Sequence, residues 1–353
     1  MADSLDLQRL ATRAAYALTQ GPRVAWYMGQ GLAMKRLRAV AKSARAPATT
    51  SFTLPGERKM RAALIDLFLR DLANVEAGLY PMPRDRDGTL VQQLARARAF
   101  FADLPDVHKR REAGHGSEVR DQVPAGRRPA YYLQNFHFQS GGWMSEDSAR
   151  IYDNQVEVLF NGSANAMRRQ ILPVLADFMR GRDQRQVHLA DLACGTGRFL
   201  GQVAQAFPRL NLTGIDLSDA YIAEARQHMR RRARARFLVA KAEELPFADD
   251  SVDAISAIFL FHELPPKIRA IVAGEIGRVL KPGGRFFLMD SLQIGDLPEF
   301  DGLLDLFPQN FHEPYYAGYV RQDLQKLFAG GGLKPVSAAP VFVSKLNVFE
   351  KAA

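Results

Sequence analysis

A glycine-rich turn follows an apolar run in the C-terminal half of the chain. Residues 187–193 read as a buried strand, Cys194-Gly-Thr-Gly197 forms the turn, and residues 198–207 have the pattern of a helix. In such a unit, backbone N–H groups at the helix N-terminus face the negative group of a ligand. Neither Gly195 nor Gly197 places a side chain between the backbone and that ligand. The turn therefore predicts a ligand-binding site.

A carboxylate stands at the end of the next strand-like run. Asp216 follows Gly197 by nineteen positions and can accept hydrogen bonds from both hydroxyls of a ribose. A dinucleotide site would have a third glycine three positions after Gly197, but Leu200 stands there. The spacing thus indicates an adenosine-like ribose and gives no support for a pyrophosphate. S-adenosylmethionine, with its methionine carboxylate and amine at the turn, fits better than a nicotinamide dinucleotide.

Four sequence blocks between residues 187 and 291 strengthen this interpretation. They are Asp191-Leu-Ala-Cys-Gly-Thr-Gly197, Gly214-Ile-Asp-Leu-Ser218, Ala242-Glu-Glu-Leu-Pro-Phe247 followed by Asp250-Ser-Val-Asp-Ala-Ile255, and Arg278-Val-Leu-Lys-Pro-Gly-Gly-Arg285. In this order they resemble the class I S-adenosylmethionine-dependent methyltransferases, and the nearest likeness is the branch of ubiquinone and menaquinone C-methyltransferases. The resemblance implies an α/β fold: a Rossmann-like, doubly wound, seven-stranded sheet, mostly parallel and closed by an antiparallel terminal hairpin.

The resemblance also implies which residues bind the cofactor, S-adenosylmethionine. Gly195 and Gly197 would back its methionine part, Asp191 would lie near its amine, and Asp216 would bind its ribose. Ala242 and Glu243 would lie beside the adenine ring. The complete predicted set is Asp191, Ala193, Gly195, Gly197, Asp216, Leu217, Ala242, Glu243 and Ile258.

Lys241 departs from the family pattern. The family often has an aspartate at this position, which accepts a hydrogen bond from the adenine amino group. Lysine has no acceptor. Glu243 or a backbone carbonyl would have to replace the aspartate, or adenine would bind more weakly.

The segment after the fourth strand-like run, Ile258 to His262, would pass under the cofactor and point at the methyl acceptor. His262 and Glu263 are therefore the candidate general bases. In the other interpretation His262 satisfies a backbone group and Glu263 begins a helix. A base is required only if the attacking atom is protonated and weakly acidic, because alignment and exclusion of water supply most of the acceleration.

Two aromatic segments are candidates for the acceptor pocket. One precedes the sheet and has a Gly-Gly pair at 141–142, typical of a lid and equally of a hydrophobic seam between two halves of the chain. The other lies in the insertion after the fifth strand, where it would line a polar end of the pocket or pack in a corner. The candidate substrate-binding residues are Tyr131, Phe136, Trp143, His312, Tyr315 and Tyr316. They favour a small, apolar or aromatic, lipophilic acceptor, and no metal site is predicted.

The predicted strands and helices must bring these candidate residues together. Strand-like and helix-like runs alternate from residue 187 onwards, which is typical of a parallel sheet with helices on both faces. Residues 1–150 are expected to form a mainly helical region that acts as a lid, a substrate cap or a membrane-facing segment. Residues 151–353 are expected to form the S-adenosylmethionine-binding domain. Within the first region, Pro22 is expected to open a second helix, and residues 108–128 are expected to form a loop.

The composition narrows the possible cellular location and partners of the protein. A single cysteine, Cys194, excludes an intrachain disulfide and favours a reducing compartment, and no run is apolar enough to span a membrane. The protein is therefore expected to be cytoplasmic. The net charge of +9 raises the options of nucleic acid and anionic membrane as partners. The basic residues with aromatic neighbours between 23 and 45 would form either a packed helical cap or a peripheral membrane contact.

Three functions remain open. The first is methyl transfer to a small, apolar acceptor. The second is methylation of RNA or protein, which predicts basic residues that converge on the cofactor cleft. The third is a non-catalytic module that binds S-adenosylmethionine, which predicts a damaged cofactor site. The residues favour the first.

Overall fold

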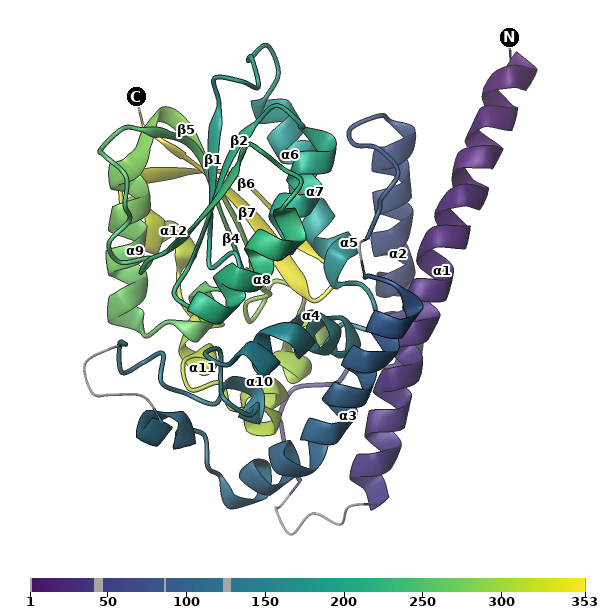
Figure 1. Ribbon diagram of the computed structural model, residues 1–353, viewed down its shortest axis with the longest axis vertical. Coiled ribbons are helices and arrows are strands. Elements are labelled where there is room, and N and C mark those ends of the chain that lie inside the picture. The colour runs from purple at the N-terminus through teal and green to yellow at the C-terminus, as the bar shows by residue number, and fades with distance from the viewer. Residues whose placement is uncertain (1, 41–46, 86, 123–127, 353) are drawn as a thin grey trace.

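A seven-stranded sheet forms the centre of the protein. The computed structural model describes residues 2–40, 47–85, 87–122 and 128–352 (Figure 1). The strands are β1 (His188–Leu192), β2 (Asn211–Asp216), β3 (Ala235–Val239), β4 (Val252–Ile258), β5 (Leu280–Ser291), β6 (Leu333–Val341) and β7 (Ser344–Lys351). Their order is β3-β2-β1-β4-β5-β7-β6, and only β7 runs antiparallel to its neighbours. The sheet prediction is confirmed, including the terminal hairpin.

Helices cover both faces of the sheet and continue into an N-terminal region. They are α1 (Ala2–Val40), α2 (Glu57–Glu76), α3 (Leu90–Ala113), α4 (Glu146–Leu159), α5 (Ala164–Arg169), α6 (Ile171–Phe178), α7 (Arg198–Ala206), α8 (Asp219–Met229), α9 (Pro266–Val279), α10 (Asp301–Asn310), α11 (Tyr316–Tyr319) and α12 (Leu324–Ala329). Short 3₁₀ turns are η1 (Glu118–Gln122), η2 (Phe136–Phe138), η3 (Phe261–Glu263) and η4 (Pro298–Phe300).

The alternation of side chains along a strand divides the core into two layers. Phe287 and Met289 of β5 pack with α6, α7 and α8, whereas Phe286 and Leu288 pack with α9 and α12. All four are fully buried. Since successive side chains of a strand point to opposite faces, an apolar run such as this one requires helices on both sides. Packing on both faces holds the sheet in place. It therefore also holds the edge of the sheet at which the turns after β1, β2 and β4 meet.

The N-terminal region is helical as expected, but two details of the prediction were wrong. Pro22 does not begin a new helix; it lies inside α1, which is continuous. The buried side chains Tyr16 and Tyr27 hold α1 against the body on both sides of Pro22, and this packing outweighs the lost backbone hydrogen bond. The expected loop at 108–128 is also partly helix, because α3 continues to Ala113 and ends at Gly114, whose φ is 67°.

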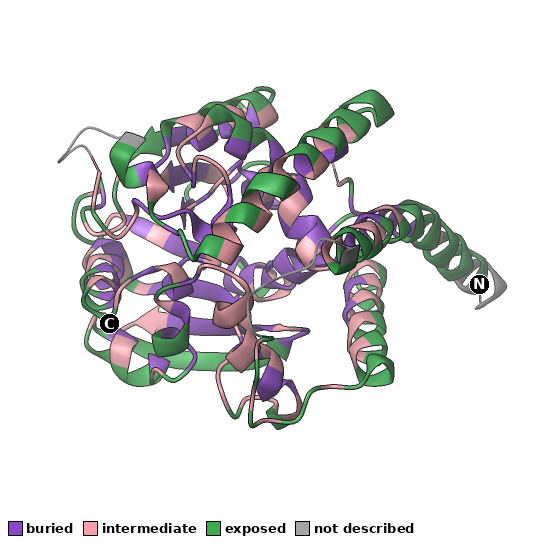
Figure 2. Ribbon diagram, turned by 90° about the horizontal axis from the view of Figure 1, so that it is seen from below, coloured by how far each residue is buried: buried purple, intermediate pink, exposed green. Residues whose placement is uncertain are grey.

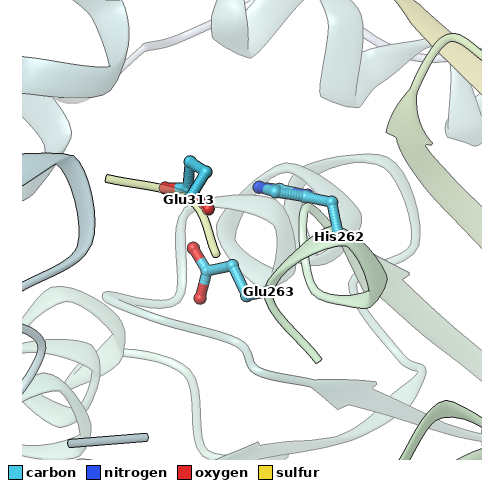
Figure 3. A group of neighbouring side chains, drawn as sticks. All are labelled: His262, Glu263 and Glu313. Carbon is cyan, nitrogen blue, oxygen red and sulfur yellow. The ribbon is translucent and has the colours of Figure 1, made fainter. Parts of the chain in front are cut away.

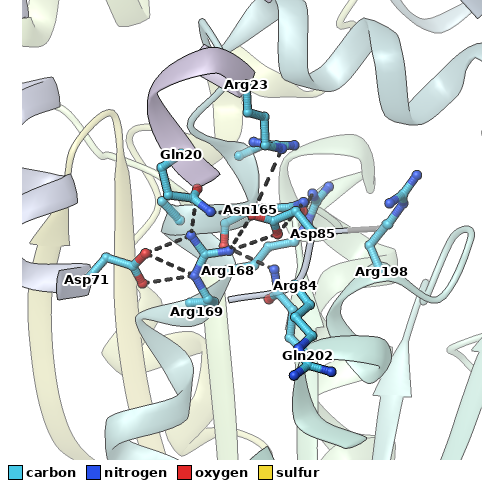
Figure 4. A network of polar contacts seen from close by, with 12 residues as sticks. Gln20, Arg23, Asp71, Arg84, Asp85, Asn165, Arg168, Arg169, Arg198 and Gln202 are labelled. Atoms are coloured by element: carbon cyan, nitrogen blue, oxygen red, sulfur yellow. Dashed lines mark hydrogen bonds and ion pairs between the residues drawn. The ribbon is translucent and has the colours of Figure 1, made fainter. Parts of the chain in front are cut away.

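A buried ion network fastens α1 and α2 to α5 (Figure 4). Arg169 of α5 donates to Asp71 of α2 at 2.6 Å and to Asp85 at 2.9 Å. Asp71 also accepts hydrogen bonds from the hydroxyls of Tyr16 and Tyr80, at 2.5 and 2.6 Å. Contacts therefore cross from the N-terminal helices to the helices next to the sheet. The division expected at residue 150 falls inside α4 and stays a prediction.

Asp71→Asn is expected to lower the free energy of unfolding by about 1–3 kcal/mol, because the buried Arg169 guanidinium loses one of its two carboxylate partners and keeps Asp85. Chemical denaturation would measure the change. Asp66→Asn, an exposed acid on the same helix, is the matched control and should change stability by less than about 0.5 kcal/mol. Equal effects of the two substitutions would show that the network adds no stability.

The basic residues of the N-terminal region have several environments. Arg23 is buried and pairs with Asp87 and Glu157, while Lys35 and Arg36 are exposed. Lys42 and Arg45 lie outside the described residues. The N-terminal end of α1 lies away from the body and is exposed (Figure 2), with Leu7 and Leu18 at 67% and 76%. Contact with a membrane surface stays a prediction. None of the helices in the described part of the chain is long and apolar enough to span a membrane.

Candidate active site

A pocket opens at the carboxyl ends of β1, β2 and β4, where the strand order reverses. This is the position at which open α/β sheets bind ligands. Residues of the glycine turn, of the ends of β2 and β4, and of the aromatic segment before α4 line it. They include Tyr131, Tyr132, Phe136, Trp143, Tyr152, Ala193, Gly195, Asp216, Leu217, Tyr221, Ala242, Glu243, Ile258, Phe259 and Glu263. We call it the donor pocket.

The glycine turn has the left-handed backbone that its sequence requires. Ala193, Gly195 and Gly197 have φ values of 52°, 54° and 75°, and Gly197 caps α7. Asp216 supports the turn, because its carboxylate accepts hydrogen bonds from the Gly195 N–H at 2.9 Å and the Ser218 N–H at 2.8 Å. Burial raises the pKa of Asp216 to about 6, although these hydrogen bonds act to lower it. Two hydroxyl donors from a ligand would stabilise this carboxylate further.

Glu243 supplies an acceptor at the other end of the donor pocket. Its Oε1 accepts a hydrogen bond from the Tyr131 hydroxyl at 2.5 Å, and its Oε2 is buried without a partner. A buried acceptor without a donor is costly unless a ligand supplies one. Lys241 does not line the pocket; its ammonium lies 3.5 Å from Glu244 and is about half exposed. The departure at Lys241 therefore leaves the pocket itself intact, and Glu243 offers the missing acceptor.

Aromatic side chains cover the donor pocket. The Trp143 ring contacts Phe136 in a stacked arrangement and Tyr152 and Tyr221 edge to face. The Trp143 Nε1 donates to Glu263 Oε2 at 3.1 Å, which ties the aromatic segment to η3. The expected lid residues Tyr131, Phe136 and Trp143 therefore lie beside the glycine turn and Asp216.

A small hollow continues from the donor pocket and contains Asp191. Ala193, Gly195, Tyr152 and Ile258 line both spaces, and Asp191 and Arg168 line only the hollow. Burial raises the pKa of Asp191 to about 7, although the Ser256 hydroxyl donates to it at 2.6 Å. An ammonium group would stabilise the Asp191 carboxylate, and the Arg168 guanidinium could bind a carboxylate.

A group of ionisable side chains lies beyond the end of β4 (Figure 3). The His262 Nδ1 is 2.6 Å from Asp290 Oδ1, and the other Asp290 oxygen accepts the Phe261 and His262 N–H groups. His262, Glu263 and Glu313 offer side-chain nitrogen and oxygen atoms that all lie within 4.8 Å of one another. Asp290 thus both caps η3 and orients the imidazole.

Neighbouring side chains shift the pKa values of His262 and Glu263. Burial alone would lower the pKa of His262, but the Asp290 carboxylate outweighs it and raises that pKa to about 9. Burial and the Glu313 carboxylate raise the pKa of Glu263 well above its usual value. His137 Nε2 lies 2.9 Å from Glu313. His262, Glu263 and Glu313 could hold a divalent cation by composition, but a protonated His262 has no free lone pair for one.

A second cavity of about 370 Å³ lies on the far side of Phe259. Its lining is mostly apolar and includes Phe160, Phe259, His262, Leu303, Phe307, Phe311, Tyr316 and Phe342. We call it the apolar cavity. Phe259 lines both spaces and has the rare φ of 58°. The consecutive residues His262 and Glu263 line the apolar cavity and the donor pocket respectively. One short turn therefore presents a side chain to each space.

The predicted site residues divide between these spaces. Of the expected cofactor residues, Asp191 lines the adjoining hollow and Gly197 lies behind the turn; the others line the donor pocket. Tyr316 lines the apolar cavity. His312 lies next to the Gln134 amide at 2.9 Å, and Tyr315 packs against the aromatic segment; neither lines the two larger spaces. The roles of all these residues stay predictions.

Some lining residues were not found from the sequence. Tyr152 and Tyr221 lie within helical segments whose patterns carry no functional signal, and Arg168 reads as an ordinary helix-end cation. Tyr132 and Glu313 belong to the two aromatic segments that were expected to form the lid and the polar end of the pocket, but the sequence did not pair Glu313 with Glu263. Proximity to Glu263 distinguishes it, and proximity is a property of the folded chain alone.

Known proteins share this arrangement of sequence blocks. Residues 189–284 match the family described as a methyltransferase domain. A ubiquinone/menaquinone biosynthesis C-methyltransferase from Methylobacterium nodulans is 32% identical over 45% of this chain and 62% of its own length. A demethylmenaquinone methyltransferase from Beutenbergia cavernae is 32% identical over 48% of this chain and 65% of its own length. The chain carries a class I S-adenosylmethionine-dependent methyltransferase domain.

The match does not extend over the whole of either protein. The matched regions span less than two thirds of the length of these two relatives. Among solved structures, an O-methyltransferase family 2 protein from Planctomyces limnophilus in complex with apigenin is 20% identical, with a TM-score of 0.46, over 59% of this chain and 62% of that chain. Residues 189–284 provide most of the lining of the donor pocket, whereas the lining residues Phe136 and Trp143, and helix α10, belong to segments outside that range.

The residues of the donor pocket fit S-adenosylmethionine. The unpartnered Glu243 Oε2 suits an amino donor, the Asp216 carboxylate suits hydroxyls, and the hollow at Asp191 and Arg168 suits an amine and a carboxylate. No lysine or arginine is among the described residues that line the donor pocket. Arginines do line the neighbouring spaces: Arg168 and Arg198 line the adjoining hollow, and a separate hollow beside Thr196 is lined by Arg96, Arg150, Arg198, Arg230 and Arg231.

Proposed function

We propose that the protein methylates a small, mainly apolar molecule that binds in the apolar cavity. One observation carries the proposal: the donor pocket and the apolar cavity share Phe259 and meet at His262 and Glu263. A methyltransferase needs its donor and acceptor in two spaces that touch at the reacting atoms. The apolar lining suits an aromatic or alkyl acceptor, as ligand sites are generally apolar with few polar groups.

The donor pocket would hold S-adenosylmethionine in an extended form. Asp216 would bind the ribose hydroxyls, Glu243 the adenine amino group, and Asp191 with Arg168 the methionine end. When bound, S-adenosylmethionine supplies an electrophilic methyl group on sulfur. The aromatic cover, with Trp143 at its centre, would exclude water from the pocket.

His262 would accept a proton from the acceptor at Nε2. Its Nδ1–H donates to Asp290, so the lone pair of a neutral imidazole lies on Nε2, at the edge that faces the apolar cavity and Glu313. The step matters if the acceptor is a hydroxyl or amine, which must lose a proton as the new bond forms. Glu263 and Glu313 would then stabilise the imidazolium.

Binding and turnover together test the proposed function. Titration calorimetry with S-adenosylmethionine and, separately, with NADH should show micromolar binding of the first alone. Purified protein with methyl-labelled S-adenosylmethionine should then transfer label to members of a panel of lipophilic phenols and hydroxy acids. Binding of neither nucleotide, or preferential binding of NADH, would overturn the proposal.

The substitutions Glu243→Ala and Lys241→Ala separate the two candidate adenine residues. Glu243→Ala is expected to weaken S-adenosylmethionine binding about 10- to 150-fold, because the amino group loses a charged acceptor worth about 1.5–3 kcal/mol. Lys241→Ala should change the dissociation constant by less than about twofold, since its side chain points to Glu244. Calorimetry on the two variants gives the comparison, and a larger effect at Lys241 would contradict the assignment.

A further inference from the structure

An arginine without a counter-ion lines the apolar cavity. Arg38, near the C-terminal end of α1, is half-buried and lies among the lining residues. None of the described residues forms a hydrogen bond or an ion pair with it. Burial and the positive charge of Arg111 both lower the pKa of Arg38. The environment thus disfavours the charge that Arg38 carries.

The chain near Arg38 offers no acid to balance it. The segment 41–46, which directly follows α1, has the sequence Ala-Lys-Ser-Ala-Arg-Ala and contains no carboxylate. The acids earlier in α1, Asp3 and Asp6, are about 48 Å or more away along the helix axis. Among the described residues that line the cavity there is no aspartate or glutamate.

Helix α1, which carries Arg38, packs against the wall of the apolar cavity. α1 passes close to Asn161, another lining residue: a Cβ on Gly31 would lie 3.6 Å from the Asn161 Oδ1. Asn310 lines the cavity too and accepts a hydrogen bond from Arg111 at 2.9 Å. A partly buried guanidinium among apolar side chains suits the binding of a carboxylate, because its planar donors match the two carboxylate oxygens.

The difference between the surroundings of Arg38 and those of His262 gives the acceptor an orientation in the apolar cavity. His262 is the only other ionisable group with a positive charge among the described lining residues, but Asp290, Glu263 and Glu313 surround it. The His262 imidazole is already paired with the Asp290 carboxylate, so it does not offer a free cation to an anionic group of the ligand. An anionic group is therefore stabilised at Arg38 and disfavoured at His262, where the nucleophile must lie.

We propose that the acceptor is an amphipathic anion: a lipophilic body that fills the apolar cavity, with a carboxylate that binds Arg38 and a nucleophilic atom at His262. This rests on the proposed function in one respect, namely that the apolar cavity holds the acceptor. It adds the chemical class of the substrate and explains why a helix outside the methyltransferase domain reaches the cavity.

Two fluorescent probes of almost equal shape test the charge at Arg38. Anilinonaphthalene sulfonate is an aromatic monoanion, and N-phenylnaphthylamine is its neutral counterpart without the sulfonate. The unaltered protein should bind the anion more tightly. Arg38→Met, which keeps the apolar stem, should weaken binding of the anion at least about tenfold and change binding of the neutral probe by less than about twofold. Arg38→Lys should restore much of the difference.

Two further variants make the result specific. Arg36→Met removes the same charge from an exposed position of α1 and should leave both affinities unchanged. Leu303→Trp fills the cavity and should weaken both probes, which places them there. Three outcomes would overturn the proposal. Arg38→Met could weaken binding of both probes equally or leave binding of the anion unchanged, or the unaltered protein could bind both probes with equal affinity.

The outcome does not depend on methyl transfer. Neither probe is methylated and no S-adenosylmethionine is added, so an anion-selective site at Arg38 would be found even if the protein transferred no methyl group. Conversely, methyl transfer to neutral acceptors alone would support the proposed function and contradict the anionic acceptor.

Discussion

His262→Asn is expected to lower kcat by about 10²- to 10⁴-fold on a hydroxyl acceptor, the range for loss of a general base. The asparagine amide can still donate to Asp290, so η3 should stay in place, but no group replaces the Nε2 lone pair. Binding of S-adenosylmethionine, which we propose rests on Asp216 and Glu243, should change by less than about twofold. Initial rates and calorimetry together separate the two effects.

The pH dependence gives an independent test of the same residue. Because Asp290 raises the pKa of His262 to about 9, the imidazole is mostly protonated at neutral pH and cannot accept a proton. A base acts only in its neutral form, so the rate should rise with pH and level off above about 9. Asp290→Asn should move this rise to lower pH, since it removes the carboxylate that favours the imidazolium. A positioning role for His262 alone would leave the profile flat.

Two controls make the assignment of the base to His262 specific. His115→Asn makes the same change at an exposed position outside both spaces and should leave kcat unaltered. Dialysis against a chelator should also leave the rate of the unaltered protein unchanged, because the raised pKa values of His262 and Glu263 favour protons over a metal ion at this group. Loss of activity that a divalent cation restores would assign these residues to a metal site instead.

Asp216→Ala is expected to raise the dissociation constant of S-adenosylmethionine at least about 100-fold. Two ribose hydroxyls lose a charged acceptor, and each such hydrogen bond contributes about 1.5–3 kcal/mol. The Gly195 and Ser218 N–H groups lose their acceptor as well, so the turn also becomes less well fixed. Titration calorimetry measures the constant, and circular dichroism on heating checks that the variant folds.

Asp219→Ala is the matched control for Asp216. Asp219 begins α8 a few residues away, and its side chain is 67% exposed in an ion pair with Arg128. Its removal should change the dissociation constant by less than about twofold. Normal binding by Asp216→Ala would mean that the donor pocket is assigned to the wrong ligand.

Local sequence was sufficient for the sheet and for most of the donor pocket. The apolar runs specify strands buried on both faces. Gly195, Gly197 and Asp216 lie within a few residues of the ends of those strands. Parallel strands bring their carboxyl ends to one edge of the sheet. The positions of these residues in space therefore follow from their positions in the sequence.

The N-terminal region shows where local patterns fail. Pro22 and the charged residues after 108 signal interruptions, yet α1 and α3 continue through both places. Packing of Tyr16, Tyr27 and Phe100 against the body exceeds the local preference for a break. Intrinsic propensities amount to about 1 kcal/mol per residue, or about 3 for proline, so buried tertiary contacts can override them.

The sequence by itself determined the α/β sheet, the glycine turn and the carboxylate at Asp216, and with them the class of cofactor. Only the tertiary structure decided that His262 contacts Asp290 and lies near Glu313, that Glu243 lines the donor pocket with one unpartnered oxygen, and that Arg38 reaches the apolar cavity. These groups come from segments far apart in the chain. Their approach depends on how helices and insertions pack against the sheet, which is set by the sum of many weak apolar contacts and leaves no local pattern in the sequence.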